Sequence, residues 1–274
     1  MISPNSSRIV IGASSDIGYA LSSHWLSLGH NVVGTYRIYS EHISQLESAG
    51  AVLFQCDLSV ESSVDSAAKQ ILASIESWEV LSMLPGTMMP IQPFEECDFN
   101  HWANSFQVNF LNQIRMLHGL LTGRSKSTEH GALILFCAGG GSNSAPKNLS
   151  AYTASKIALT KICELLDAEI SDIRSVIVGP GWVKTRIHQE MISTGDLGGE
   201  AYLRTLERFE ADNFVPMAQV LGCIDWLYSQ PKEVVGGRNF SVPHDLWGSQ
   251  AMIDKLNSNI NMYKLRRHFN EWKP

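Results

Sequence analysis

The sequence predicts a doubly wound α/β fold, a three-layer αβα sandwich in which helices cover both faces of a parallel sheet. Short runs rich in Val, Ile and Leu recur along the chain, and each has the length of one buried strand. They span residues 8–12, 31–36, 51–55, 80–84, 132–137 and 174–179. The segments between them show helical spacing of apolar residues, such as Ile17, Leu21 and Trp25, which places one apolar stripe against a sheet. This alternation is typical of the doubly wound arrangement.

The pattern predicts a single domain over residues 1–274. A length of 274 residues permits one or two domains, but no repeat or Pro/Gly-rich linker interrupts the pattern before about residue 185. The segment at about 186–215 is polar, contains glycines and ends in a helical stretch, so we expect an active-site lid there, with a surface excursion as the alternative. Residues from about 243 to 274 are expected to form a C-terminal extension.

Composition and charge exclude several kinds of partner. Hydrophobic residues make up 44% and charged residues 18% of the chain, which suits a globular protein with a substantial core. The formal net charge of -6 provides no broad basic surface for a nucleic-acid backbone, and no apolar stretch is long enough to span a membrane. The N-terminus lacks the regions of a signal peptide. The cysteines form no CxxC pair and the histidines no HExxH motif, so we expect a cytoplasmic protein without disulfides or a metal site.

A glycine-containing turn directly after the first strand predicts a phosphate-binding loop. It reads Gly12-Ala13-Ser14-Ser15-Asp16-Ile17-Gly18 and opens a helix that runs to Leu28. Backbone N–H groups at such a helix start face an anionic pyrophosphate. Glycines allow close approach of the ligand, and the hydroxyls of Ser14 and Ser15 add hydrogen bonds. A turn without a ligand is the alternative, but its place after the first strand favours dinucleotide binding and hence the Rossmann fold.

The end of the second strand predicts which dinucleotide is bound. An acidic residue at this place would accept hydrogen bonds from the adenosine ribose and select NAD. The sequence instead reads Gly34-Thr35-Tyr36-Arg37 and has no carboxylate here. Because the Arg37 guanidinium suits a 2′-phosphate, we expect NADP(H), with a solvent-facing arginine as the alternative.

A tyrosine and a lysine one helical turn apart predict a catalytic pair. After the fifth strand the chain reads Ser150-Ala151-Tyr152-Thr153-Ala154-Ser155-Lys156 within a helical stretch, so Tyr152 and Lys156 share a face. We expect the ammonium to lower the pKa of the phenol, which would make Tyr152 a usable proton donor near neutral pH. Such a pair is often structural, but its place at the carboxyl edge of a sheet that carries a phosphate loop favours catalysis.

These motifs, in this order, resemble those of the short-chain dehydrogenase/reductase family over residues 8 to about 242. The resemblance is carried by GASSDIG, Asp57-Leu58, Asn109, YTASK and PGWVKT. It implies that Tyr152 is the general acid/base, that Lys156 holds the nicotinamide ribose and tunes the tyrosine, and that Asn109 supports a water-linked proton relay. A helix-interior amide satisfied locally is the alternative for Asn109. The implied further cofactor contacts are Asp57, Leu58, Gly86, Pro180, Gly181, Val183 and Thr185. The resemblance also implies a homodimer or homotetramer built through the helices at 98–121 and 150–170.

The sequence departs from the family pattern at three places. Asp16 stands where the phosphate loop usually has glycine, and we expect it to cap the helix start, with a side chain that faces away from the pyrophosphate as the alternative. Leu84-Pro85-Gly86 replaces Asn-Ala-Gly and so loses an amide that ties adjacent strands, although Gly86 still permits close cofactor approach. No serine lies about thirteen residues before Tyr152, where the family places the group that polarises the substrate carbonyl. Ser142 is a candidate replacement or a plain loop hydroxyl, and losing such a donor slows turnover by about 10²–10³-fold.

Taken together, the motifs predict an NADP-dependent oxidoreductase that transfers a hydride between NADPH and a ketone or aldehyde, with a small molecule as its partner. Residues 236–247 and the later MYKLRRH weakly resemble family members associated with bacterial surface-polysaccharide pathways, which suggests a sugar-like substrate. A catalytically weak NADP-binding or sensor protein and a sugar dehydratase or epimerase are the alternatives. The further pocket candidates, with surface exposure or packing as the alternative, are His188, Trp182, Met191 and Trp247.

Overall fold

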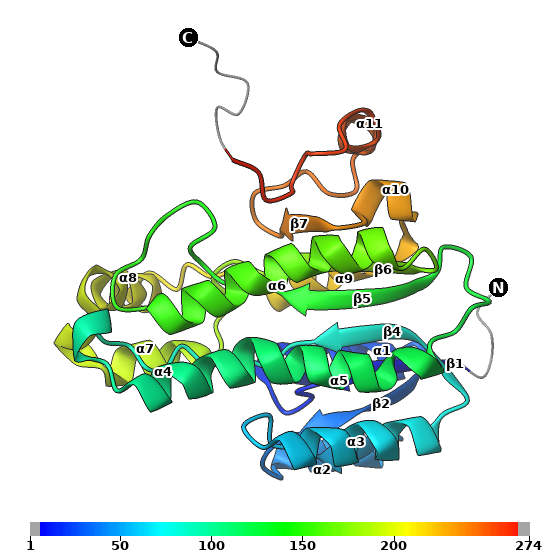
Figure 1. Cartoon of the computed structure of the whole chain (residues 1–274), viewed down its shortest axis with the longest axis horizontal. Helices are drawn as coiled ribbons and strands as arrows, with labels where there is room; N and C mark the ends of the chain where they lie inside the picture. Colours follow the sequence, from blue (N-terminus) through cyan, green and yellow to red (C-terminus); the bar gives the residue numbers. More distant parts are fainter. Residues whose placement is uncertain (1–5, 268–274) are drawn as a thin grey trace.

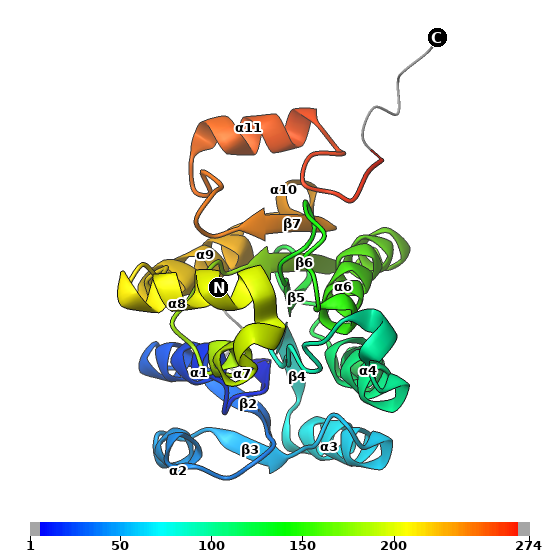
Figure 2. The ribbon, with the colours of Figure 1, turned by 90° about the vertical axis from the view of Figure 1, so that its left-hand side faces the viewer.

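The computed structural model describes residues 6–267 and contains a seven-stranded sheet between two layers of helices (Figures 1 and 2). The strand order is β3-β2-β1-β4-β5-β6-β7, and every neighbouring pair is parallel. The strands are β1 (Ser6–Ile11), β2 (Asn31–Tyr36), β3 (Val52–Gln55), β4 (Ser77–Met83), β5 (Ala132–Cys137), β6 (Ile173–Gly179) and β7 (Arg238–Ser241). All six predicted strands are present, so the doubly wound Rossmann fold is confirmed.

Helices pack on both faces of this sheet (Figure 2). One layer contains α1 (Asp16–Ser27), α2 (Glu41–Ser48) and α9 (Met217–Ser229), and the other contains α3 (Glu61–Ser74), α5 (Asn112–Leu120) and α6 (Ser150–Glu169). Each face of the sheet has its own apolar core, because successive residues of a strand point to opposite faces. In β1, Val10 accordingly belongs to the core beneath α1, α2 and α9, while Ile9 and Ile11 belong to the core beneath α3, α5 and α6. Burial on both faces explains why these strands are continuous apolar runs rather than alternating ones.

The helix predicted at 98–121 is present with an irregular middle turn. Asp98 caps its start by accepting hydrogen bonds from the backbone N–H groups of Asn100 and His101. Between α4 (Phe99–Phe106) and α5 the turn Gln107–Leu111 is a π-helix, and the whole runs as one rod along the sheet in Figure 1. Such π-turns are frequent at functional sites, and Asn109 lies in this one.

The segment 236–247 contains a strand that the apolar pattern did not predict. Arg238–Ser241 forms β7, which pairs with β6 from Val176 to Gly179. Its sequence RNFS has a single apolar residue, so it lacks the apolar run that marked the other strands. The buried Arg238 guanidinium donates to the carbonyls of Leu256 and Met262. It thereby ties the sheet to the chain around α11 (Gln250–Ser258). The last seven residues of the predicted extension, 268–274, lie outside the described residues.

The candidate lid at 186–215 lies in the crossover between β6 and β7, beside the carboxyl ends of the strands (Figure 1). It contains α7 (Ile187–Ser193), a 3-10 turn (Gly195–Gly198) and α8 (Gly199–Glu210). The remaining short elements are α10 (Lys232–Val235) and 3-10 turns at Phe94–Glu96 and Leu121–Gly123.

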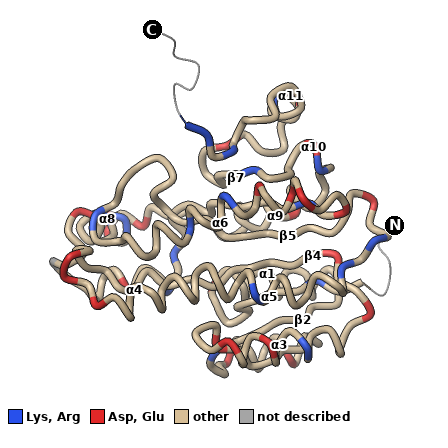
Figure 3. The backbone as a smooth tube through the Cα atoms, viewed as in Figure 1, with Lys and Arg blue, Asp and Glu red and all other residues tan. Residues whose placement is uncertain are grey.

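Acidic and basic residues are interspersed over the described chain (Figure 3). No helix within residues 6–267 is long and apolar enough to cross a membrane.

Candidate active site

The loop after β1 has the geometry expected of a phosphate loop. Gly12 has a φ of +84°, in the left-handed region that favours glycine. A Cβ atom at Gly18 would overlap the carbonyl oxygen of Gly12, so α1 can pack this closely on the loop only with glycine at that position. Ser15 caps α1, because its Oγ accepts a hydrogen bond from the Gly18 N–H at 3.0 Å. The residues present therefore fit a pyrophosphate at the start of α1.

Asp16 connects this loop to the candidate lid. The prediction that it caps α1 is wrong, because Ser15 holds that position. The Asp16 carboxylate accepts hydrogen bonds from the backbone N–H (2.6 Å) and Nε (3.0 Å) of Arg186. The Arg186 guanidinium also donates to the carbonyl oxygen of Ser14. Since Arg186 directly precedes α7, this ion pair ties the start of the candidate lid to the phosphate loop and balances the charge that Asp16 brings there.

An open hollow lies where β2 and β3 end, and its lining residues are Arg37, Ile38, Gln55, Asp57, Val60 and Ser63. The exposed Arg37 and the Asp57 carboxylate thus face one space, as a site for the adenosine end of a dinucleotide requires. Hydrogen bonds from Ser59, opposed by partial burial and aided by Arg37, hold the pKa of Asp57 below its usual range. The neighbouring Leu58 is buried, and its carbonyl accepts a hydrogen bond from Asn112 at 2.7 Å.

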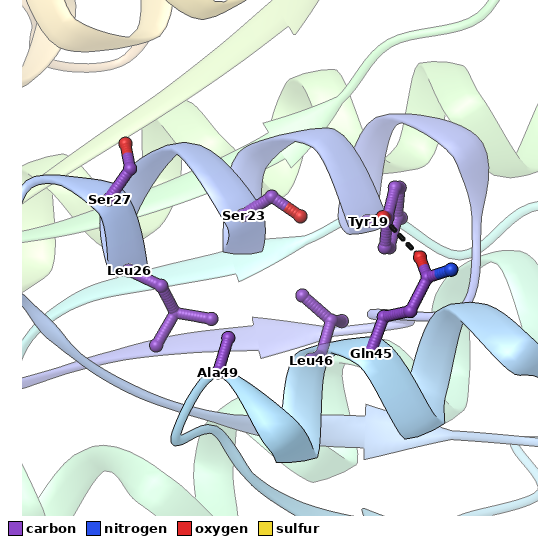
Figure 4. Close-up of a pocket in the computed structure, with 7 residues that line it drawn as sticks. All are labelled: Tyr19, Ser23, Leu26, Ser27, Gln45, Leu46 and Ala49. Atoms are coloured by element: carbon purple, nitrogen blue, oxygen red, sulfur yellow. Dashed lines mark hydrogen bonds between the residues drawn. The ribbon is translucent and has the colours of Figure 1, made fainter.

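A second hollow lies between α1 and α2 (Figure 4). Its lining residues are Tyr19, Ser23, Leu26, Ser27, Gln45, Leu46 and Ala49. Tyr19 Oη donates to Gln45 Oε1 at 2.6 Å across it. The predicted site residues lie elsewhere, so this hollow is separate from the candidate active site.

Tyr152 and Lys156 lie on α6 as predicted, but their electrostatics differ from the prediction. Lys156 Nζ donates to the carbonyl oxygen of Cys137 at 3.0 Å and lies 5.9 Å from the centre of the Tyr152 ring. Burial raises the pKa of Tyr152, and the nearby Cys137 and Glu190 add to this effect. Burial also lowers the pKa of Lys156. The predicted lowering of the Tyr152 pKa is therefore wrong for this arrangement, because desolvation dominates.

Gly139 occupies the position thirteen residues before Tyr152 where the family has its serine. A Cβ atom at Gly139 would lie 2.7 Å from Tyr152 Oη and 2.7 Å from Lys156 Cγ, closer than real Cβ contacts. The tyrosine hydroxyl thus fills the space that a side chain at residue 139 would need. Ser142, farther along the same loop, is exposed, and its role as a replacement stays a prediction.

Asn109 is fully buried and holds the loop that follows β4. Its Oδ1 accepts from the Thr87 N–H at 2.9 Å, while its Nδ2 donates to the Thr87 carbonyl at 2.9 Å and to Ser105 Oγ at 3.2 Å. Gly86 lies between the two polar candidates, because a Cβ atom there would be 3.5 Å from Lys156 Nζ and 3.7 Å from Asn109 Oδ1. The fold therefore gathers Gly86, Asn109, Tyr152 and Lys156, and it satisfies the Asn109 amide locally.

Two polar residues at this site, the buried Gln113 and the partly buried Glu190, carried no sequence motif. Gln113 of α5 donates from Nε2 to the Pro85 carbonyl at 3.1 Å, so it secures the chain near the place where the family's asparagine is lost. Glu190 of α7 accepts from the Met88 N–H at 2.6 Å and from Thr87 Oγ1 at 3.1 Å. Burial raises the pKa of Glu190. Neither residue stands out from its helical neighbours in the sequence, since only the tertiary contacts give it a role.

The residues after β6 lead from the sheet into α7. Gly181 has a φ of +74°, and Thr185 Oγ1 donates to the Val183 carbonyl at 3.2 Å. The His188 ring stacks on Trp182, with ring centres 4.8 Å apart, and its Nε2 lies 3.1 Å from the Val183 carbonyl oxygen. Burial lowers the pKa of His188. His188 is thus half-buried and contacts Trp182 and the Val183 carbonyl, rather than being an exposed histidine.

The other two pocket candidates, Met191 and Trp247, lie in different parts of the molecule. Met191 is 2% exposed and packs in an apolar cluster that contacts Tyr152. Trp247 packs near Trp226 and donates from Nε1 to the Val242 carbonyl at 2.9 Å, so it is a partly buried residue that packs against the core around β7. His, Cys, Asp and Glu side chains form no group of three that could hold a metal ion within the part of the chain that the structure describes.

Comparison with known proteins gives matches over most of the chain. Residues 7–195 match the family model for short chain dehydrogenase. Fatty acyl-CoA reductase from Acinetobacter baylyi is 29% identical over 168 residues, which cover 59% of this chain and 56% of that protein. The chain thus spans little more than half the length of this relative.

Two solved structures share the fold. A short chain dehydrogenase/reductase from Saccharomyces cerevisiae has a TM-score of 0.77 at 20% identity, covering 91% of this chain and 98% of that one. A short chain dehydrogenase from Burkholderia cenocepacia in complex with NADP has a TM-score of 0.71 at 18% identity, covering 86% and 95%. Because the family model spans more than half of the sequence, the chain belongs to the short-chain dehydrogenase/reductase family.

Proposed function

We propose that this oxidoreductase reduces a ketone or aldehyde with NADPH and that Tyr152 protonates the carbonyl oxygen. One observation carries the proposal: Gly86, Asn109, Tyr152 and Lys156 meet at the carboxyl edge of the sheet. Beside them lies a loop that fits a pyrophosphate, and β1 and β4 mark the switch point of the strand order, where ligands of such sheets bind.

The cofactor would be held along this edge. We propose that the loop residues Gly12, Ser14, Ser15, Asp16, Ile17 and Gly18 surround the pyrophosphate. Arg37 would bind the 2′-phosphate, with Asp57 and Leu58 beside the adenine. The nicotinamide end would contact Gly86, Tyr152, Lys156, Pro180, Gly181, Val183 and Thr185. Bound NADPH would supply the hydride.

A protonated Tyr152 suits the role of proton donor in this proposal. Because burial raises its pKa, the phenol keeps its proton at neutral pH and is available as a donor. Lys156, held by the Cys137 carbonyl, lies one helical turn away, so it would support the tyrosine as negative charge develops on the phenol oxygen. Asn109 would keep the loop that carries Gly86 in place, and a link from Asn109 to solvent remains part of the proposal.

The segment 186–215 would act as the lid over this site. The chain is proposed to work as one domain in a cytoplasmic homodimer or homotetramer, with contacts through the rod of α4 and α5 and through α6. Solution scattering measures this directly, and a monomeric mass would contradict it.

Binding of the cofactor without turnover is the second candidate function, and Gly139 favours it because the serine hydroxyl is lost there. Thermal unfolding with NADPH, NADH or neither tests both functions, since a ligand at 100 times its Kd stabilises a fold by about 2.7 kcal/mol. Selective protection by NADPH, together with carbonyl-dependent oxidation that Tyr152→Phe abolishes, supports the reductase. Protection without oxidation supports the second candidate, and protection by neither refutes both. An altered sugar without net NADPH oxidation would indicate a dehydratase or epimerase instead.

A further inference from the structure

The helix α7 lies across the crevice in which the proposed cofactor would bind. Building on the proposed function, we infer that α7 is a gate for NADPH. Its start stays attached to the phosphate loop, and Glu190 holds the helix shut against the loop after β4 until the cofactor enters. Glu190 is thus a positioning residue that controls access to the site.

α7 joins the two loops that border the crevice. β1 and β4 are neighbours at the switch point of the strand order, and Figures 1 and 2 show α7 beyond the carboxyl ends of the strands. Arg186, at the start of α7, bonds to Ser14 and Asp16 in the loop after β1. Glu190, one turn later, bonds to residues 87–88 in the loop after β4. Because ligands of such sheets bind between these loops, α7 spans the entrance from one side to the other.

The attachment through Glu190 is the one that would release. Arg186 is held by its backbone N–H as well as by its guanidinium, whereas Glu190 is held by its carboxylate, which accepts from the Met88 N–H and from Thr87 Oγ1. The buried Asn109 amide fixes Thr87 to the body of the protein, so that loop does not follow α7. Burial raises the pKa of Glu190, and opening returns water to its carboxylate, which offsets part of the cost of the broken bonds.

The closed gate leaves little room for the nicotinamide end. A Cβ atom built on Gly86 would lie 3.5 Å from Lys156 Nζ, 3.7 Å from Asn109 Oδ1 and 3.8 Å from Ile187 Cδ1. These are ordinary contact distances, so the three atoms border a space about the size of one carbon atom. A ribose in contact with both Gly86 and Lys156 is larger than this. Ile187, and with it α7, therefore has to move before the nicotinamide end is seated.

Apolar packing keeps the closed form dominant. Met191 of α7 is 2% exposed and packs with the buried side chains of Met88, Ile91 and Leu149, which belong to the body of the protein. Opening α7 exposes this side chain to water, which costs free energy. The open form is then a minor state, and binding of NADPH at high concentration proceeds no faster than the gate opens.

Stopped-flow mixing of the full chain with NADPH tests the gate, with energy transfer from tryptophan to the bound dihydronicotinamide as the signal. We expect the observed rate to reach a plateau as the NADPH concentration rises. Glu190→Ala removes the bonds to the loop after β4 and should raise the plateau about tenfold, which corresponds to about 1.4 kcal/mol. Thr87→Val removes the hydroxyl that donates to Glu190 and should raise it less. Gln189→Ala, at an exposed residue of α7, is the matched control and should leave it unchanged.

A rate that rises linearly with NADPH, or a plateau that neither variant raises, would overturn the inference while NADPH binding itself stands. If NADPH does not bind, the proposed function fails, and hydrogen exchange without cofactor decides the gate separately. The amides of α7 should then exchange about tenfold faster in Glu190→Ala than in the parent, with those of α6 unchanged. Equal exchange in α7 would show that Glu190 does not hold the helix. Thr87→Val serves for the same comparison if Glu190→Ala does not fold.

Discussion

Introducing the family's serine at residue 139 should harm this protein rather than improve it. The change Gly139→Ser places a Cβ atom 2.7 Å from both Tyr152 Oη and Lys156 Cγ, and both side chains also pack against the rest of the site. Overpacking of this kind costs about 1–3 kcal/mol. At about 2–4 °C per kcal/mol for a chain near this size, we expect the melting temperature to fall by roughly 2–12 °C.

The activity of Gly139→Ser should fall as well, because the tyrosine hydroxyl must move. A displacement of about 1 Å in a catalytic group can cost about 10²-fold in rate. Gly140→Ser is the matched control: a Cβ atom there meets nothing within 4 Å, so its stability should change by no more than about 0.5 kcal/mol. Calorimetry and steady-state kinetics with NADPH measure both effects.

One result would refute this reasoning. If Gly139→Ser has the same melting temperature as the parent protein and a turnover rate about 10²–10³ times higher, the serine fits and supplies the expected hydrogen-bond donor to the substrate carbonyl. Tyr152 would then have room to shift aside, and the crowding around residue 139 would have no functional meaning.

Three further predictions concern charged residues. Arg37→Glu should weaken NADPH binding and improve NADH binding in titrations, and an unchanged ratio of the two Kd values would remove Arg37 from the 2′-phosphate site. Arg186→Ala leaves the negative charge of Asp16 unbalanced beside the phosphate loop. NADPH should then bind about fivefold more weakly, because an exposed ion pair is worth about 1 kcal/mol. The double variant with Asp16→Asn should regain the affinity, and failure to do so would argue against charge as the cause. Glu190 has a folded pKa raised by burial, so the parent protein should lose stability relative to Glu190→Gln as the pH rises from about 4 through that raised pKa. Urea unfolding across this range measures the difference, and a difference independent of pH would contradict the burial argument.

Apolar periodicity and motif order predicted the sheet and most of the candidate site, because strands buried on both faces need continuous apolar runs. The same criterion missed β7, whose arginine is buried by bonds to carbonyl groups instead of by apolar contact. Asp16 and Arg186 are 170 positions apart, and no local pattern records such a pairing. The direction of the Tyr152 pKa shift could not be predicted for a related reason: helical spacing reveals the neighbouring lysine, but only the packed structure reveals how fully the phenol is desolvated.

The position of the candidate lid within the β6–β7 crossover also bears on how the chain folds during synthesis. About 60 residues separate the end of β6 from the start of β7, and at about 5–20 residues per second their synthesis takes roughly 3–12 s. During that time β6 has an unpaired edge that another chain could join. The short strand β7 closes this edge last, so the segment that completes the sheet also ends the period in which the nascent protein is most exposed to aggregation.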